Sequence, residues 1–144
     1  MPYWRLFYHF TWGTKLREPL IDPGFEADLH QVIAAKAIEL QAVVHAVSGI
    51  EDHAHLVVSV PPKLALSTFI GQVKGNSSHF VNHVVRPGYT FAWQEEYGVI
   101  SFGERHLGWV VQYTLRQREH HEAGTTIARL ERVSEYWGPA RRAS

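Results

Sequence analysis

The sequence predicts an α+β fold, in which four strands and two helices follow one another in the order strand, helix, strand, strand, helix, strand. Three observations predict it. Apolar residues alternate along several short segments, as they do in half-buried strands. They recur at helical spacing along two longer segments, and proline or glycine separates the segments. A third helix, which carries a tyrosine, and a helical C-terminal tail at residues 123–144 are expected to follow.

Composition places the chain among globular proteins. Its 144 residues are 45% hydrophobic and 19% charged, which is enough apolar material for a core and too little charge for disorder. Cysteine is absent, so disulfides, thiolate zinc sites and cysteine nucleophiles are excluded. The chain shows neither a signal-peptide pattern nor an apolar run of membrane-spanning length. We expect one soluble, cytoplasmic domain over residues 1–144, with no membrane contact.

The net charge gives only weak guidance about partners. Fourteen basic residues balance fourteen acidic ones, whereas proteins that bind nucleic acids usually carry a basic excess. Arginines are concentrated in residues 105–144. A basic C-terminal side on a neutral chain is compatible with contacts to a phosphate backbone.

The first half of the chain supplies three strands and the first helix. An N-cap acceptor followed by proline, Asp22-Pro23, predicts the start of a helix that continues to about Gln41. Alternating apolar residues predict strands on either side of this helix, at 3–12, 43–51 and 53–60.

The second half supplies the remaining elements of the fold. Helical spacing predicts helices at 66–84, 107–121 and 125–137, and alternation predicts a fourth strand at 98–102. Gly75 is a weak point within the first of these helices, which ends at Arg86-Pro87-Gly88. The complete order is that of the ferredoxin-like plait. Because many activities use this fold, the fold alone assigns no function.

Two histidines on the third strand form a candidate metal site. Side chains alternate faces along a strand, so His53 and His55 project from the same side and can chelate one divalent ion. On an otherwise apolar strand, polar side chains cost free energy unless they are satisfied. Solvent-facing or hydrogen-bonded structural histidines are the alternative, and the spacing alone leaves both open.

The third helix adds a candidate nucleophile. Tyr113 and Gln117 are four residues apart and share one helix face, at the edge of an apolar stripe. A packing role for Tyr113 and an ordinary surface role for Gln117 are the alternatives. His120 is placed to compete with Gln117 as a metal ligand. A metal site beside a phenol nucleophile has the groups needed to cut and rejoin a nucleic-acid strand.

The motifs, taken in order, resemble those of the small single-domain HUH transposases that use one catalytic tyrosine, including the REP-associated relatives. The resemblance covers most of the chain and rests on the segments 10–15, 17–20, 52–59, 61–63, 73–78, 93–98 and 113–117. One departure is the acidic pair Glu95-Glu96, where family members often carry a basic residue.

The resemblance implies a mechanism, a cofactor and a substrate. His53, His55 and Gln117 would hold Mg²⁺ or Mn²⁺, and Tyr113 would attack the scissile phosphate to give a 5′-phosphotyrosine. Single-stranded DNA, with hairpin ends, would be the substrate. Residues that could contact this DNA are Lys74, Trp93, Tyr97, Arg116 and Arg118.

The resemblance also implies a homodimer with shared active sites. A helix that directly follows the fourth strand is not expected to reach the open sheet face that carries the histidines. One subunit's tyrosine helix would therefore complete the histidine pair of the other. Two alternatives stay open: a domesticated or inactive relative that binds DNA hairpins without cutting them, and a ferredoxin-like module for RNA or a small ligand, whose histidines are structural.

Overall fold

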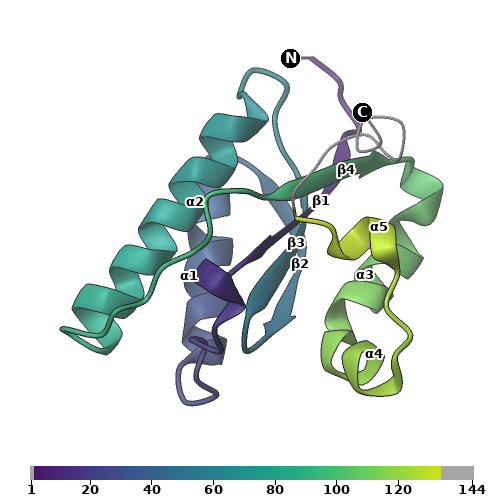
Figure 1. Cartoon of the computed structure of the whole chain (residues 1–144). Coiled ribbons are helices and arrows are strands. Elements are labelled where there is room, and N and C mark those ends of the chain that lie inside the picture. The colour runs from purple at the N-terminus through teal and green to yellow at the C-terminus, as the bar shows by residue number, and fades with distance from the viewer. Residues whose placement is uncertain (1, 134–144) are drawn as a thin grey trace, which may run out of the picture.

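A computed structural model describes residues 2–133 and places one sheet between two layers of helices (Figure 1). The strands are β1 (Phe7–Gly13), β2 (Val43–Ile50), β3 (His53–Ser59) and β4 (Gly98–Phe102). The helices are α1 (Glu26–Glu39), α2 (Leu66–Phe80), α3 (Leu107–Leu115), α4 (Gln117–Ala123) and α5 (Ala128–Glu131). The predicted order of strands and helices is confirmed. Within the described residues, no helix has the length and apolar character needed to cross a membrane.

The sheet is antiparallel throughout, in the order β2-β3-β1-β4. This is the strand arrangement of the ferredoxin-like plait, as the sequence predicts. Because β3 pairs with β1 on one side and β2 on the other, it is an inner strand. His55 lies opposite Thr11 and His53 opposite Gly13, so both histidines sit on an inner strand, toward one end of the sheet.

The main core lies between the sheet and the pair α1 and α2. Its largest side chains are almost completely buried. Phe10, Trp12 and Leu56 come from the strands, and Phe25 and Phe69 come from the helical side. Fully burying one such side chain contributes about 1.5–3 kcal/mol. This layer therefore supplies most of the stability, and it fixes the strand that carries the histidines.

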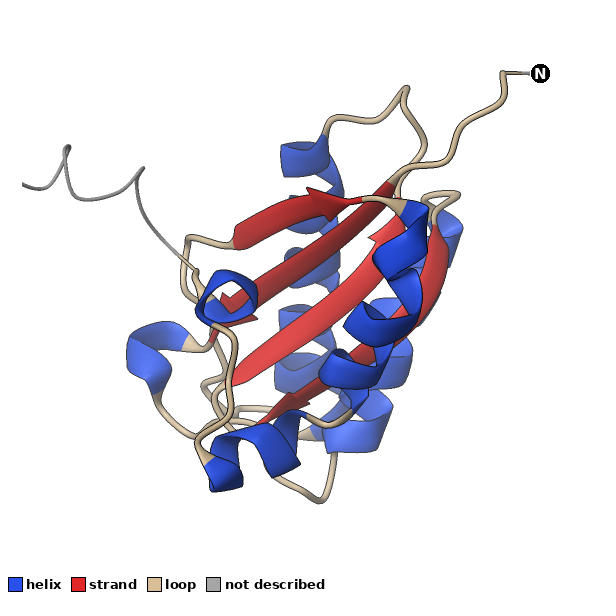
Figure 2. Ribbon diagram, turned by 90° about the vertical axis from the view of Figure 1, so that its right-hand side faces the viewer, coloured by secondary structure: helices blue, strands red, loops and turns tan. Residues whose placement is uncertain are grey.

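The opposite face of the sheet is covered, so the expectation of an open face is wrong. Helix α3 packs on β2 and β3, α4 on β2, and α5 on β1 and β4 (Figure 2). A small apolar cluster of Ala46, Val57 and Val110 joins α3 to the strands. All seven residues of β3 are buried as a result. This face of the sheet carries apolar side chains, which would be exposed to water if it were open. Burying them stabilises the packing of the second helix layer on the sheet.

Two predicted helices have other boundaries in the structure. The expected single helix at 107–121 is interrupted at Arg116, whose φ of −107° and ψ of 31° are not helical, so that α3 and α4 are separate. In the predicted tail helix, α5 covers only four residues, and residues 134–144 lie outside the described part. Helix α2 ends in a π-helical turn at Val81–Val85.

Two isoleucines on α1 test how strongly the main core stabilises the fold. Ile33 is fully buried, whereas Ile38 is 60% exposed. Replacing Ile33 with Ala should lower the free energy of unfolding by about 2–5 kcal/mol, because it removes buried methyl groups and leaves a cavity. Ile38→Ala, made in the same helix, should change it by no more than about 0.5 kcal/mol. Urea unfolding measures both, and equal losses would contradict the assigned core.

Candidate active site

The two strand histidines form the centre of the candidate site. His53 and His55 are buried on the face of β3 that the second helix layer covers. Their ring centroids lie 4.9 Å apart. The predicted common face of the two side chains therefore agrees with the structure, but the expected solvent exposure of that face does not.

Each imidazole has an outer nitrogen, Nδ1, and an inner nitrogen, Nε2, which faces the centre of the site. The outer nitrogen of each ring has a hydrogen-bonding partner. Asp52 Oδ1 lies 2.7 Å from His53 Nδ1, and His9 Nε2 lies 2.9 Å from His55 Nδ1. Burial, together with the nearby His55, lowers the pKa of His9 to about 3, so His9 is neutral and its Nε2 can accept a hydrogen bond. With both Nδ1–H groups donating outward, the Nε2 lone pairs of His53 and His55 face the interior of the site. Sequence reasoning missed His9, which lacks any ligand spacing.

Two side-chain oxygens meet these inner nitrogens. Gln117 Oε1 lies 3.3 Å from His53 Nε2. Glu131 Oε1 lies 3.5 Å from His53 Nε2 and 3.3 Å from His55 Nε2. The structure thus brings the predicted Gln117 to the histidine pair, and it adds Glu131, which no spacing in the sequence indicated. Glu131 reaches the site because the chain reverses at Gly124, whose φ is 70°.

The chemistry of this cluster fits a divalent cation. Within the described residues, the buried His55 Nε2 has no hydrogen-bonding partner, and neither does the amide nitrogen of Gln117. One nitrogen from each histidine and one oxygen of Glu131 lie within 4.8 Å of one another. Imidazole, carboxylate and amide groups that present lone pairs to one point repel each other unless a cation lies between them. His53, His55, Gln117 and Glu131 are therefore the residues that could hold a metal.

Tyr113 lies against the same cluster. Its hydroxyl donates a short hydrogen bond to Glu131 Oε2 and accepts one of 2.9 Å from the backbone N–H of Ile127. Burial and the bond to Glu131 raise the pKa of Tyr113 to about 12. For Glu131, burial is outweighed by the neighbouring His55 and by the hydrogen bond from Tyr113, which hold its pKa at about 2. At neutral pH the proton therefore stays on the phenol oxygen.

The tyrosine and the histidines of this site belong to one chain. The 3-10 turn at Glu104–His106 follows β4 and directs α3 back across β2 and β3. The expectation that the helix cannot reach the histidine face of its own sheet is therefore wrong. The short connection is sufficient because α3 lies directly on the strands, with Val110 packed against Val57.

The two adjacent histidines of α4 differ in their surroundings. His120, expected to compete with Gln117 as a ligand, instead stacks on Tyr113 with ring centroids 4.5 Å apart, and its Nδ1 lies 2.9 Å from Thr125 Oγ1. His121 Nε2 lies 3.2 Å from Gln117 Oε1 and 3.4 Å from Glu131 Oε1. The chain leaves helical geometry at Arg116, so α4 begins as a separate helix at Gln117.

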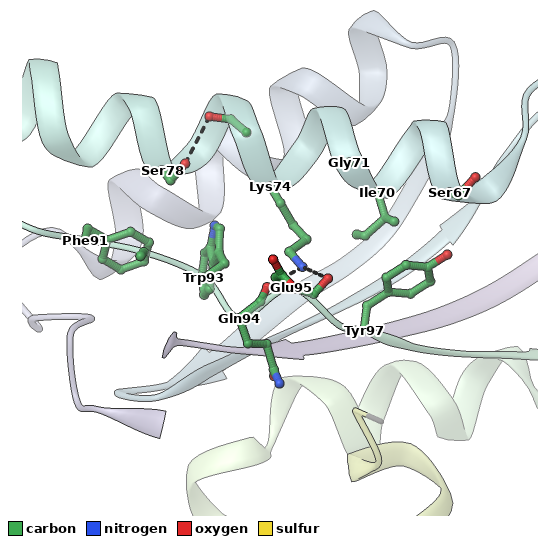
Figure 3. Close-up of a pocket in the computed structure, with 12 residues that line it drawn as sticks. Ser67, Ile70, Gly71, Lys74, Ser78, Phe91, Trp93, Gln94, Glu95 and Tyr97 are labelled. Atoms are coloured by element: carbon green, nitrogen blue, oxygen red, sulfur yellow. Dashed lines mark hydrogen bonds between the residues drawn. The ribbon is translucent and has the colours of Figure 1, made fainter. Parts of the chain in front are cut away.

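Three of the candidate DNA contacts surround a cavity of about 460 Å³ between α2 and the segment before β4 (Figure 3). Lys74 Nζ donates to the carbonyl groups of residues 94–96 at 2.6, 3.1 and 3.1 Å, so its three hydrogens are engaged. Trp93 Nε1 donates to Ser77 Oγ at 2.9 Å. Tyr97 lines the cavity and packs on Phe10. In this arrangement Lys74 shapes the cavity and has no hydrogen left for a phosphate.

The other two candidate DNA contacts lie on the surface near the site. Arg116 is exposed at the break between α3 and α4. Arg118 forms ion pairs with Glu51 at 3.1 Å and Glu26 at 3.7 Å. Exposed pairs of this kind contribute at most about 1 kcal/mol, so a phosphate could replace the carboxylates.

Known proteins share this arrangement of sheet and helices. A transposase of Deinococcus radiodurans R1 aligns with a TM-score of 0.61 and 23% identity, over 78% of this chain and 92% of its own. A REP-associated tyrosine transposase bound to a REP hairpin aligns with a TM-score of 0.62 and 15% identity, over 88% of this chain and 76% of its own. None of the curated proteins matches the sequence.

The fold is thus that of the solved transposases. The family model of the IS200-like transposases matches residues 2–117, from the start of the described chain to Gln117. The chain belongs to this family, as the resemblance of its motifs predicts. Glu131 and His121 lie beyond the matched segment.

The contact between Glu131 and Tyr113 predicts how the phenol titrates. An anionic acceptor stabilises the protonated phenol, so Glu131→Gln should lower the pKa of Tyr113 from about 12 toward its ordinary value of 10. Tyrosinate absorbance of the metal-free protein measures the change, with Tyr113→Phe as the reference that removes this one titration. An unchanged pKa in Glu131→Gln would show that burial alone raises it, and a higher pKa would show that Glu131 acts in the opposite direction.

Proposed function

We propose that this transposase cleaves and rejoins single-stranded DNA through a 5′-phosphotyrosine intermediate on Tyr113. A divalent cation, Mg²⁺ or Mn²⁺, would be held by His53, His55 and Gln117, with Glu131 as a further oxygen ligand. The observation that carries the proposal is the continuous contact from the Tyr113 hydroxyl through Glu131 to the inner nitrogens of both histidines. The pair His53-Ala54-His55 would then be an HUH motif.

The substrate we propose is DNA with hairpin ends. One structural neighbour, the REP-associated tyrosine transposase, is bound to a REP hairpin, and that protein shares this fold. Arg116 and Arg118 are exposed on the helices that carry the site, where they can meet a phosphate backbone. Neutral overall charge makes such local contacts more important for affinity than a general electrostatic attraction.

Tyr113 would carry out the chemical step. Its phenol oxygen attacks the scissile phosphorus and releases its proton to water. The bond between phosphorus and the 3′-oxygen of the neighbouring nucleotide breaks, and that oxygen takes up a proton from water. The products are a phosphotyrosine ester and a free 3′-hydroxyl. The ester retains the energy of the phosphodiester bond, so a second 3′-hydroxyl can reverse the step and join new ends without ATP.

The surrounding residues would orient and tune this nucleophile. Glu131 and the N–H of Ile127 fix the position of the phenol oxygen, and stacking on His120 fixes the plane of the ring. The raised pKa of Tyr113 keeps the phenol protonated at neutral pH, because a buried phenolate beside the Glu131 carboxylate would be repelled by it. When bound, the cation supplies Lewis-acid stabilisation of the negative charge on the phosphate.

A comparison of two tyrosines tests the nucleophile. Tyr113→Phe removes one oxygen, so hairpin binding should persist while the covalent protein–DNA adduct with a single-stranded hairpin oligonucleotide disappears. Tyr97→Phe, at the cavity on the other side of the sheet, should retain the adduct. Denaturing gels detect the adduct and gel shifts detect binding.

Two outcomes of this assay would contradict the proposal. An adduct that persists in Tyr113→Phe would show that another residue is the nucleophile. Hairpin binding by the wild-type protein without any adduct, in Mg²⁺ or Mn²⁺, would favour the alternative of a domesticated relative that binds hairpins without cutting them.

A further inference from the structure

We propose that His121 is a third imidazole ligand of the cation site, and that the site therefore takes a transition-metal ion such as Mn²⁺ in preference to Mg²⁺. This inference rests on the cation site of the proposed function and adds a ligand to it. His121 lies outside the segment that the family model matches, which ends at Gln117.

The distances around Glu131 Oε1 carry the inference. This oxygen lies 3.5, 3.3 and 3.4 Å from the Nε2 atoms of His53, His55 and His121. Ligand atoms at right angles around an octahedral ion, with bonds of about 2.1 Å, are separated from one another by roughly 3.0 Å. All three imidazole nitrogens thus lie a few tenths of an ångström beyond this spacing from one carboxylate oxygen. Among the described residues, the group of His, Asp and Glu ligand atoms that lie within 4.8 Å of one another comprises His53, His55 and Glu131, so His121 would complete the site by moving toward them.

The course of α4 explains why His121 faces the site. Gln117 and His121 are four residues apart on α4 and therefore lie on the same helix face. The Nε2 atom of His121 is 3.2 Å from Gln117 Oε1, and its ring centroid is 4.8 Å from that of His53. With 29% of its side chain exposed, the imidazole can adjust its position when an ion binds.

The number of imidazoles determines which ions the site prefers. Mg²⁺ prefers oxygen ligands and retains water, whereas imidazole favours transition-metal ions. The oxygens of Gln117 and Glu131 alone would suit Mg²⁺. Three nitrogens beside them favour Mn²⁺ and the later divalent ions of the first transition row.

Substitution of the adjacent residues His120 and His121 provides a matched pair of variants for measuring Mn²⁺ affinity. Mn²⁺ binding to the full-length, DNA-free protein can be followed by the loss of the free-ion signal in electron paramagnetic resonance. His121→Ala should weaken Mn²⁺ binding about tenfold or more. His120→Ala, one residue away on the same helix, should leave it within about twofold, because His120 contacts Tyr113 and Thr125 instead. Unchanged Mn²⁺ affinity in His121→Ala would overturn the proposal.

A second measurement counts the coordinated nitrogens directly, and its decisive result comes from the wild-type protein. Pulsed paramagnetic resonance of Mn²⁺ bound to the wild-type protein should detect three coupled imidazole nitrogens, and two in His121→Ala. Competition should require a large molar excess of Mg²⁺ to displace Mn²⁺. Two nitrogens in the wild-type protein, or displacement by equimolar Mg²⁺, would overturn the inference.

These measurements separate the inference from the proposed function. They contain no DNA, so they report only on the metal ligands. A wild-type protein that binds Mn²⁺ through three nitrogens but forms no DNA adduct would contradict the proposed function and leave this inference intact. A protein that forms the DNA adduct but binds Mn²⁺ through only two nitrogens would support the proposed function and overturn this inference.

Discussion

Hydrogen bonds at the outer nitrogens of two buried imidazoles determine where their inner nitrogens point, and the rest of the site is arranged around those inner nitrogens. Asp52 holds His53, and the neutral His9 on the neighbouring strand holds His55. Both rings are almost completely buried, so neither can turn without displacing the side chains packed against it. Preorganisation of this kind lowers the cost of binding a cation, because the ligands need not be ordered when it arrives.

The second helix layer supplies the remaining groups and buries most of the site. Glu131 arrives from α5, and the carbonyl of Arg132 lies so close to Gly98 that a side chain at that position would collide with it. The glycine at the start of β4 therefore allows the C-terminal segment to lie on the sheet edge. In the resulting low-dielectric environment, the charge of Glu131 acts strongly on both Tyr113 and His55.

Local patterns in the sequence were sufficient for the fold and for part of the site. Alternation located the strands, and the two-residue spacing of His53 and His55 placed both on one face, because strand geometry is local. The four-residue spacing of Tyr113 and Gln117 likewise identified two groups that meet the histidines, although the helix between them is interrupted.

The groups that the sequence did not reveal depend on contacts between distant segments. His9 reaches His55 through the pairing of β1 with β3, and Glu131 arrives after the reversal at Gly124. Neither contact produces a repeating pattern of residues in the sequence. The sequence also offered His120 as a competing ligand, whereas in the structure His120 stacks on Tyr113 and His121 lies beside Gln117 Oε1.

The central claim is that the histidine pair and Tyr113 of one chain act together as one catalytic unit. The most direct test mixes two inactive variants, His55→Ala and Tyr113→Phe, and measures formation of the covalent adduct with a single-stranded hairpin. A site completed within one chain predicts no recovery of activity, because neither variant retains both groups. Recovery of adduct in the mixture would contradict this account and would support the homodimer with shared sites that the family resemblance implies.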